Sequence, residues 1–211
     1  MIFRFETEAG MIRAIFSDVG GVLGSNGWDR PARRKTIEQF KIDWGDFAER
    51  HELVVNVFET GHLGLDAYLD RTIFYRPRNF TRQEFQEVMF SQSEPFQQPL
   101  DFYGALAQSG KYLMAALNNE SLDLNLYRIE KFGLQKVFSV FFSSCFLGIK
   151  KPNDAMYALA LQLTQLQPEE CLFIDDRPLN VERARRFGMR TIHCQDPARL
   201  PAQMQEMGVA P

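Results

Sequence analysis

A lone carboxylate stands where the first apolar run of the chain gives way to a tight glycine loop. The run over residues 12–16 is rich in branched and aromatic side chains, and Asp18 is followed by Gly20 and Gly21. Such a run is typical of a buried strand in a parallel sheet, and ligands bind just outside the carboxyl ends of these strands. The glycines let a ligand approach the main chain closely. Asp18 is therefore a candidate for chemistry, with a simple turn-capping role as the alternative.

Polar residues also follow later apolar runs, as if each strand ended in one. Asn118 ends the second run, Lys151 lies beyond the third, and Asp175 and Asp176 end the fourth. The carboxyl ends of parallel strands share one edge, so we expect Asp18, Asn118, Lys151 and Asp175 to converge. Clustered carboxylates suit Mg²⁺, which keeps waters that a phosphate can replace, and a lysine can hold a phosphate oxygen. Taken alone, the aspartate pair is also typical of a helix N-terminus.

Composition limits the class of protein. The 211 residues, of which 45% are hydrophobic and 19 are Phe, suit one packed domain or one domain with an insertion. The net charge of -3, with no basic stripe, argues against nucleic acid as a partner. Three well-separated cysteines lack metal-ligand spacing and indicate buried thiols in a reducing compartment. Charges interrupt the N-terminal segment, and the apolar run 137–149 is too short to span a bilayer, so we expect a soluble cytoplasmic protein without a membrane partner.

The chain alternates between strand-like and helix-like stretches after residue 95. We expect strands over 112–117, 137–142, 171–174 and 191–193, with helices between them, which indicates βαβ units and a parallel sheet. Residues 32–92 instead show helical periodicity only, with a capping box at Thr81 and Glu84 and a helix resuming at 65 and ending at Pro77. The predicted fold class is α/β, a Rossmann-like three-layer core (1–27 and 93–211) with an inserted helical cap (28–92). Residues 1–11 are left open as an extension or an edge strand.

Four ordered motifs give the chain a resemblance to a known family. They are FSDVGGVL at 16–23, LNN at 117–119, GIKKP at 148–152 and FIDDRPLNV at 173–181. With these motifs the chain resembles the haloacid dehalogenase (HAD) superfamily, in the subgroup that carries a small helical cap after the first strand. The resemblance covers 12–193 and includes the cap stretch 59–61.

The resemblance implies a nucleophile and a metal. Asp18 would attack phosphorus to give an aspartyl-phosphate that water then hydrolyses. Mg²⁺ would be held by Asp18, the Gly20 carbonyl and Asp175, with Asp176 in support. The metal would neutralise the repulsion between a carboxylate and a phosphate.

The same resemblance implies a phosphate-binding set. Lys151 would bind the phosphate and orient the nucleophile, and Asn118 with the Asn119 N–H would hold the transferring oxygens. Gly21, where the main chain is open to close approach, completes the predicted phosphate-binding positions. Asn180 is expected to be structural, with contact to the metal shell as the alternative.

Two positions depart from the family pattern. Gly20 stands where most phosphatases of this family have a second Asp that protonates the leaving alcohol, a loss of general-acid catalysis that typically costs about 10² to 10⁴ in rate. Asn118 stands where Ser or Thr is usual. His62, in a turn of the cap, is a hypothetical replacement proton donor. Trp28 and Arg30 are candidates for substrate contact, with a core or hinge role for Trp28 as the alternative.

Three functions follow from this pattern. The leading one is a Mg²⁺-dependent phosphatase of low activity that acts on a small phosphomonoester, with sugar phosphates as a candidate class. The second is a non-catalytic relative that binds metal and phosphate, which Gly20 and Asn118 favour. The third is a 2-haloacid dehalogenase, against which the Asp175–Asp176 pair argues, because attack on a halide gains nothing from a cluster of anions around a metal. The oligomeric state is not predicted.

Overall fold

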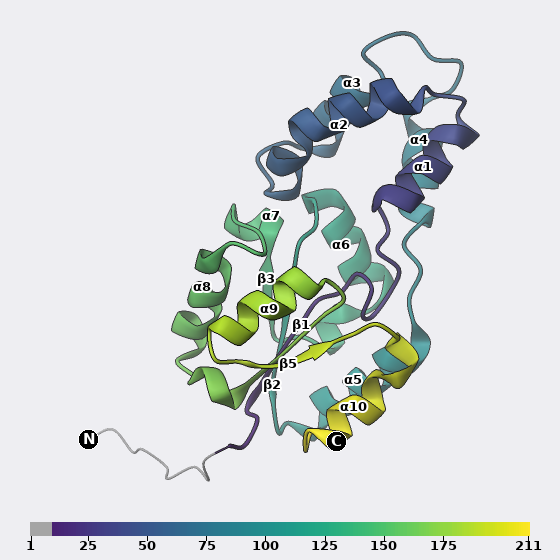
Figure 1. Ribbon diagram of the computed structural model, residues 1–211. Coiled ribbons are helices and arrows are strands. Elements are labelled where there is room, and N and C mark those ends of the chain that lie inside the picture. The colour runs from purple at the N-terminus through teal and green to yellow at the C-terminus, as the bar shows by residue number, and fades with distance from the viewer. Residues whose placement is uncertain (1–9) are drawn as a thin grey trace.

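The sheet that carries the polar strand ends is wholly parallel, with five strands in the order β3-β2-β1-β4-β5. The structure, a computed structural model, describes residues 10–211 (Figure 1), so the expectation for the segment before residue 10 lies outside it. The strands are β1 (Ala14–Ser17), β2 (Leu113–Asn118), β3 (Val140–Ser143), β4 (Cys171–Asp175) and β5 (Arg190–His193). The predicted α/β fold class is confirmed. The central strand β1 delivers its carboxyl end, and Asp18 after it, to the middle of one sheet edge.

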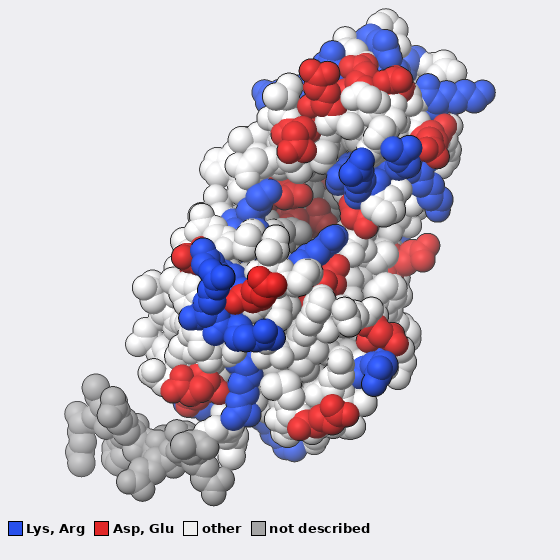
Figure 2. Space-filling model, viewed as in Figure 1, with Lys and Arg blue, Asp and Glu red and all other residues white. Residues whose placement is uncertain are grey.

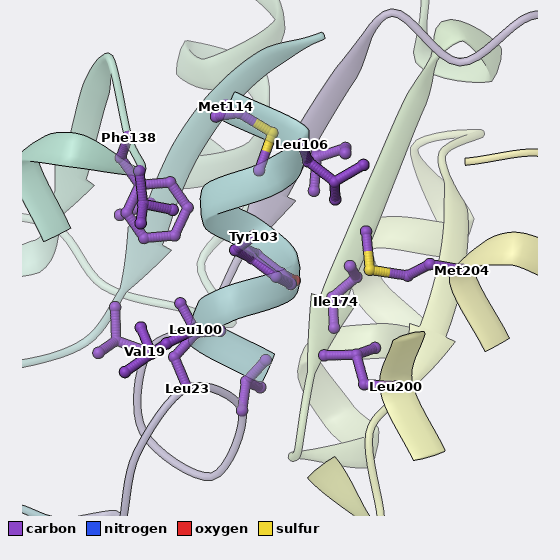
Figure 3. Packing of buried hydrophobic residues seen from close by; sticks show 14 of the residues in the cluster. Val19, Leu23, Leu100, Tyr103, Leu106, Met114, Phe138, Ile174, Leu200 and Met204 are labelled. Atoms are coloured by element: carbon purple, nitrogen blue, oxygen red, sulfur yellow. The ribbon is translucent and has the colours of Figure 1, made fainter. Parts of the chain in front are cut away.

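Both faces of the sheet are buried, which accounts for the unbroken apolar character of the strands. Because successive strand residues point to opposite faces, Ile15 packs on one side while Ala14 and Phe16 pack on the other. The first face is covered by α5 (Gln97–Ser109), α6 (Leu122–Lys131) and α10 (Leu200–Glu206), and the second by α8 (Asp154–Thr164) and α9 (Pro178–Arg186). Figure 3 shows Tyr103 of α5 in the middle of this group, with Ile174 of β4 between it and the α10 side chains Leu200 and Met204.

Four helices between β1 and α5 bury a separate apolar group. They are α1 (Arg30–Gln39), α2 (Trp44–Glu59), α3 (Leu65–Thr72) and α4 (Arg82–Ser91). Figure 1 shows them together, on the side of the sheet where β1 ends. Trp28, Phe47, Tyr68 and Phe85 are buried among them. The boundaries drawn for a separate cap domain stay a prediction.

Capping and proline signals in the sequence predicted some helix ends correctly and others incorrectly. The capping box of Thr81 and Glu84 at the start of α4 is confirmed. The helix expected to reach Pro77 ends at Thr72, where the chain turns: Phe74 N–H donates to the Leu69 carbonyl and the Arg78 guanidinium to the Ile73 carbonyl. Within residues 10–211 no helix has the length and apolarity needed to cross a membrane.

The third strand is shorter than predicted. Gly133 adopts a left-handed φ of 65° and starts a 3-10 turn over Leu134–Lys136, so the apolar residues Val137 and Phe138 continue that turn rather than a strand. Pairing with β2 starts after them, where Ser139 N–H donates to the Met114 carbonyl. The C-terminal helix α10, the short α7 (Ser144–Leu147) and the 3-10 turns at Pro168–Glu170 and Pro197–Arg199 were not predicted.

Candidate active site

A buried lysine joins two of the predicted residues. The Lys151 side chain has 0% exposure, and its Nζ lies 3.0 Å from Asp18 Oδ2 and 2.5 Å from Asp175 Oδ2. Burial lowers the pKa of Lys151, but the carboxylates of Asp175 and Asp18 oppose this, and the net result is a raised pKa. Lys151 is therefore a fixed positive charge between two carboxylates.

Asn119 sets the position of that lysine. Its Oδ1 accepts the Lys151 N–H at 2.8 Å, and its Nδ2 donates to the Lys151 carbonyl at 2.8 Å. This pair of hydrogen bonds ties the loop after α7 to the end of β2. The side chain of Asn119 thus positions Lys151, a contact that spacing in the sequence does not reveal.

Asp18 is held at the opening of the site. Its Oδ1 accepts the Val19 N–H at 2.7 Å, while its Oδ2 faces Lys151. Burial raises the pKa of Asp18 to about 7, an effect that Lys151 opposes and that Asp175 and Asp176 reinforce. Because the carboxylate is desolvated, its negative charge is poorly stabilised. A bound cation would stabilise that charge, and reaction with an electrophile would remove it.

Three carboxylates converge as predicted. Asp18, Asp175 and Asp176 each offer an oxygen, and these oxygens lie within 4.8 Å of one another. Asn180 Nδ2 donates to both oxygens of Asp175, at 3.0 and 3.1 Å, so this residue contacts the acidic cluster directly. Asp176 Oδ1 is buried and has no hydrogen-bond partner in the described part of the chain, and burial raises the pKa of Asp176. An orphaned carboxylate oxygen beside two further carboxylates fits a hard divalent cation. The Gly20 carbonyl as a further ligand stays a prediction.

Asn118 and Gly21 are placed differently from what phosphate contact would need. Asn118 is 2% exposed, its Nδ2 donates to Asn125 Oδ1 at 2.9 Å, and its Oδ1 accepts from Ser143 Oγ at 2.7 Å. The Gly21 N–H donates to the Gly24 carbonyl at 2.7 Å. Both groups are engaged inside the protein, so their roles in phosphate binding stay predictions that these contacts do not support.

Asn26 occupies the space next to Gly20. A Cβ at Gly20 would lie 2.8 Å from Asn26 Oδ1, and Asn26 Nδ2 donates to Asp176 Oδ2 at 3.0 Å. The position that usually carries the second Asp is thus covered by an amide that orients an acidic side chain of the cluster. Asn26 was not predicted, because a lone Asn in a glycine-punctuated loop looks like turn chemistry.

Gly21 is required for a different reason, which gives a testable prediction. Its φ is +70°, and a Cβ there would lie 2.5 Å from the Asp176 carboxyl carbon. We expect Gly21→Ala to displace this carboxylate, to cost about 1–2 kcal/mol in backbone strain, and to weaken Mg²⁺ binding by about 10- to 100-fold. Calorimetric titration with Mg²⁺ and thermal unfolding measure both effects. Gly104→Ala in α5, where a Cβ meets nothing within 4 Å, is the matched control; equal Mg²⁺ affinity of the two variants would contradict the assignment.

A cavity of about 350 Å³ opens in front of Asp18, under the helices of the insertion. Asn119, Glu120 and Asp176 line it on the sheet side, and Trp28 and Arg33 on the α1 side. Figure 2 shows acidic side chains within a hollow whose rim carries Lys and Arg. A larger surface depression beside α5, formed by residues such as Leu100 and Lys136, contains none of the predicted site residues.

Histidines contribute nothing to this cavity in the described residues. His62 is exposed, contacts Thr60 Oγ1 at 3.0 Å through Nδ1, and packs beside Gly148. His51 is buried against the Tyr68 hydroxyl at 2.8 Å, and burial lowers the pKa of His51 to about 3. The hypothetical proton donor His62 is therefore not among the residues that line the site.

The protein therefore has an α/β fold in which a cluster of carboxylates lies at the carboxyl edge of a parallel sheet. The buried Lys151 compensates part of the negative charge of this cluster. The chain belongs to the haloacid dehalogenase-like hydrolases: the model of that family matches residues 12–188. The predicted family membership is thereby confirmed.

Known proteins agree with this placement. Flavin mononucleotide hydrolase 1 of Arabidopsis thaliana is 27% identical over 163 residues, which cover 76% of this chain and 64% of that relative, so the chain spans less than two thirds of its length. A HAD family enzyme of Bacteroides thetaiotaomicron, solved with magnesium and inorganic phosphate, has a TM-score of 0.69 at 22% identity and covers 86% of this chain and 93% of that one. An L-2-haloacid dehalogenase has a TM-score of 0.59 at 22% identity, covering 85% and 82%. At these identities the two structures show a shared fold.

Proposed function

We propose that the chain is a Mg²⁺-dependent phosphatase that hydrolyses a small phosphomonoester through an aspartyl-phosphate on Asp18. The observation that carries this proposal is the position of Asp18, which faces a cavity while its carboxylate is held by buried Lys151 and lies beside Asp175 and Asp176. The relative that hydrolyses flavin mononucleotide, and the neighbour solved with magnesium and phosphate, support the same class of reaction.

Each residue has a defined task in this reaction. Asp18 uses an oxygen lone pair to form the bond to phosphorus as the bond to the leaving alcohol breaks, and water later cleaves the acyl-phosphate. Lys151 holds a phosphate oxygen and keeps Asp18 in line. Asp18, Asp175 and Asp176 would hold Mg²⁺, whose charge lowers the repulsion between nucleophile and phosphate. Asn180 and Asn26 orient the two supporting carboxylates through the hydrogen bonds described above.

The site, as formed by the described residues, has no evident acid to protonate the leaving group. Gly20 offers no acid, and the other carboxylates of the cavity wall already have partners: Asp29 accepts the Ala32 N–H at 3.0 Å, Glu59 pairs with Lys150 at 2.8 Å and Glu120 pairs with Arg128 at 3.1 Å. We therefore propose that general-acid catalysis contributes little to the rate. The rate then depends on how readily the alcohol leaves as an alkoxide, without a proton from the protein.

Phosphate release from a panel of aryl and alkyl phosphomonoesters, with Mg²⁺ and with EDTA, tests the proposal. We expect turnover only with Mg²⁺, and aryl phosphates with acidic leaving groups should react about 10²-fold or more faster than alkyl phosphates of similar size. Absence of turnover on every ester, with Mg²⁺ still bound, would instead support a non-catalytic protein that binds metal and phosphate. That alternative is favoured by Gly20 and by the inward-facing amide of Asn118. Halide release from 2-haloacids in EDTA would support the dehalogenase alternative.

A further inference from the structure

We propose that Arg33, assisted by Arg30, binds a second anionic group on the leaving part of the substrate, a carboxylate or a second phosphate. The inference rests on the proposed phosphatase function and narrows its substrate class. Both arginines come from the first turns of α1, and both line the cavity that also contains Asp18. A substrate whose phosphate lies at Asp18 therefore extends its leaving group into a space that these guanidinium groups border.

Arg33 is built into the cavity wall rather than laid over the surface. Its Nη1 donates to the Trp28 carbonyl, which fixes the guanidinium, and its Nε is buried and has no hydrogen-bond partner among residues 10–211. Burial lowers the pKa of Arg33 from its ordinary value, but an arginine stays charged across the working range of pH. A fixed, partly desolvated cation that lines the cavity gains most from an anion bound there.

Outside the carboxylate cluster of Asp18 and Asp176, the other charges around the cavity already have partners. Glu59 pairs with Lys150, Glu120 with Arg128, and Arg177 with Asp176 at 3.4 Å. Asp29 contributes a nearby negative charge, yet its carboxylate is used as the N-cap of α1. In the part of the chain that the structure describes, neither Arg30 nor Arg33 forms an ion pair with a carboxylate within 4.0 Å, whereas their neighbour Arg34 pairs with Glu38 at 3.6 Å. The guanidinium groups of Arg30 and Arg33 are thus available to bind an anionic group of the substrate.

The arginine fork sets the chemistry of that anion. A guanidinium matches the two oxygens of a carboxylate or a phosphate, whereas a sugar hydroxyl leaves its charge uncompensated. The cavity of about 350 Å³ limits the ligand to a compact molecule. The substrate class is accordingly a small phosphorylated hydroxy acid or bisphosphate.

Matched pairs of phosphomonoesters test this inference. The first pair is 3-phosphoglycerate and glycerol 3-phosphate, in which a carboxylate of the first takes the place of a hydroxymethyl group of the second. The second pair is glucose 1,6-bisphosphate and glucose 1-phosphate. We expect kcat/KM with Mg²⁺ to be about 10- to 100-fold higher for the anionic member of at least one pair, mainly through KM. The pair that shows the ratio identifies the anion as carboxylate or phosphate.

Variants of Arg33 and of its neighbour Arg34 distinguish anion binding by Arg33 from a general effect of positive charge on α1. Arg33→Gln should bring the ratio close to one, and Arg33→Lys should leave an intermediate ratio because the charge remains without the fork. Arg34→Gln, on the same helix but outside the cavity, should keep the ratio of the natural protein. Thermal unfolding confirms that each variant is folded.

The outcomes distinguish this inference from the proposed function. Equal kcat/KM for both members of each pair, or a ratio that Arg33→Gln leaves unchanged, overturns the anion site while phosphate release still supports the phosphatase. If no ester is hydrolysed, the affinity of the Mg²⁺-loaded natural protein for each pair, measured by calorimetry, decides the anion site on its own. Tighter binding of the anionic member that Arg33→Gln removes would support it, and equal affinities would overturn it.

Discussion

Asp18→Asn is expected to abolish phosphate release, with a loss of about 10⁴-fold or more. The amide has the shape of the carboxylate but no lone pair basic enough to form the bond to phosphorus, and it removes one oxygen of the acidic cluster. Lys151 remains in place to bind a phosphate, and Asp175 and Asp176 remain to hold Mg²⁺, so the loss falls on kcat. Phosphate release and a binding titration with inorganic phosphate separate the two effects.

The same substitution should stabilise the metal-free protein. Burial, reinforced by two neighbouring carboxylates, raises the pKa of Asp18 from 3.8 to about 7, so its charged form is disfavoured in the folded state. The folded protein then binds more protons than the unfolded chain between these two values, and the stability of the natural protein falls as the pH rises through that range. We expect Asp18→Asn in EDTA to unfold at a higher temperature than the natural protein at pH 8, and the difference to shrink towards pH 5.

A surface carboxylate provides the control for this effect. Asp154→Asn removes a carboxylate with 57% side-chain exposure that pairs with Arg183, and it should change stability by at most about 1 kcal/mol in the destabilising direction. Full activity of Asp18→Asn would remove this residue from the mechanism. A lower unfolding temperature at pH 8 would show that its attraction to Lys151 outweighs its burial.

The positions of the acidic residues were predictable because they are tied to strand ends. A buried parallel strand is an apolar run with a visible end, so the edge on which Asp18, Lys151 and Asp175 meet follows from the alternation of strands and helices. The structure brings these residues and Asp176 together. Hydrophobic periodicity likewise predicted the helical insertion and the helices that cover the sheet, except α10.

Contacts made by single polar side chains were not predictable in the same way. Asn118, at a strand end, was expected to face the phosphate, but Ser143 on the neighbouring strand and Asn125 on the following helix hold its amide inside the protein. Asn26 and Arg33 reach the site from a loop and from α1, and their positions depend on how the insertion packs above the sheet edge. The period of a helix shows which face is apolar, but it does not show which polar residue faces a cavity.

Lys151→Met is expected to be the most destabilising of the substitutions considered. Lys151 Nζ compensates Asp18 and Asp175 from a side chain with 0% exposure, so its removal leaves two buried carboxylates without a cation. Breaking a buried pair in this way costs about 3–5 kcal/mol, which for a chain of this size lowers the unfolding temperature by roughly 6–20 °C. Met keeps the volume of the aliphatic stem, so the effect comes from charge rather than from a cavity. Turnover should also disappear, because a phosphate oxygen loses its partner.

The neighbouring residue Lys150 provides a control for the loss of a lysine charge. Lys150 pairs with Glu59 at 2.8 Å, but both side chains are 30% exposed, so Lys150→Met should cost only about 0–1 kcal/mol. In EDTA, the deficit of Lys151→Met should be larger at pH 8 than at pH 5, because protonation of the unpaired carboxylates relieves their repulsion. Mg²⁺ should recover more stability in Lys151→Met than in the natural protein, since a cation at the cluster replaces part of the lost charge. Equal unfolding temperatures for the two lysine variants, with or without Mg²⁺, would show that Lys151 does not compensate the carboxylates, and the nucleophile would then need another source of positive charge.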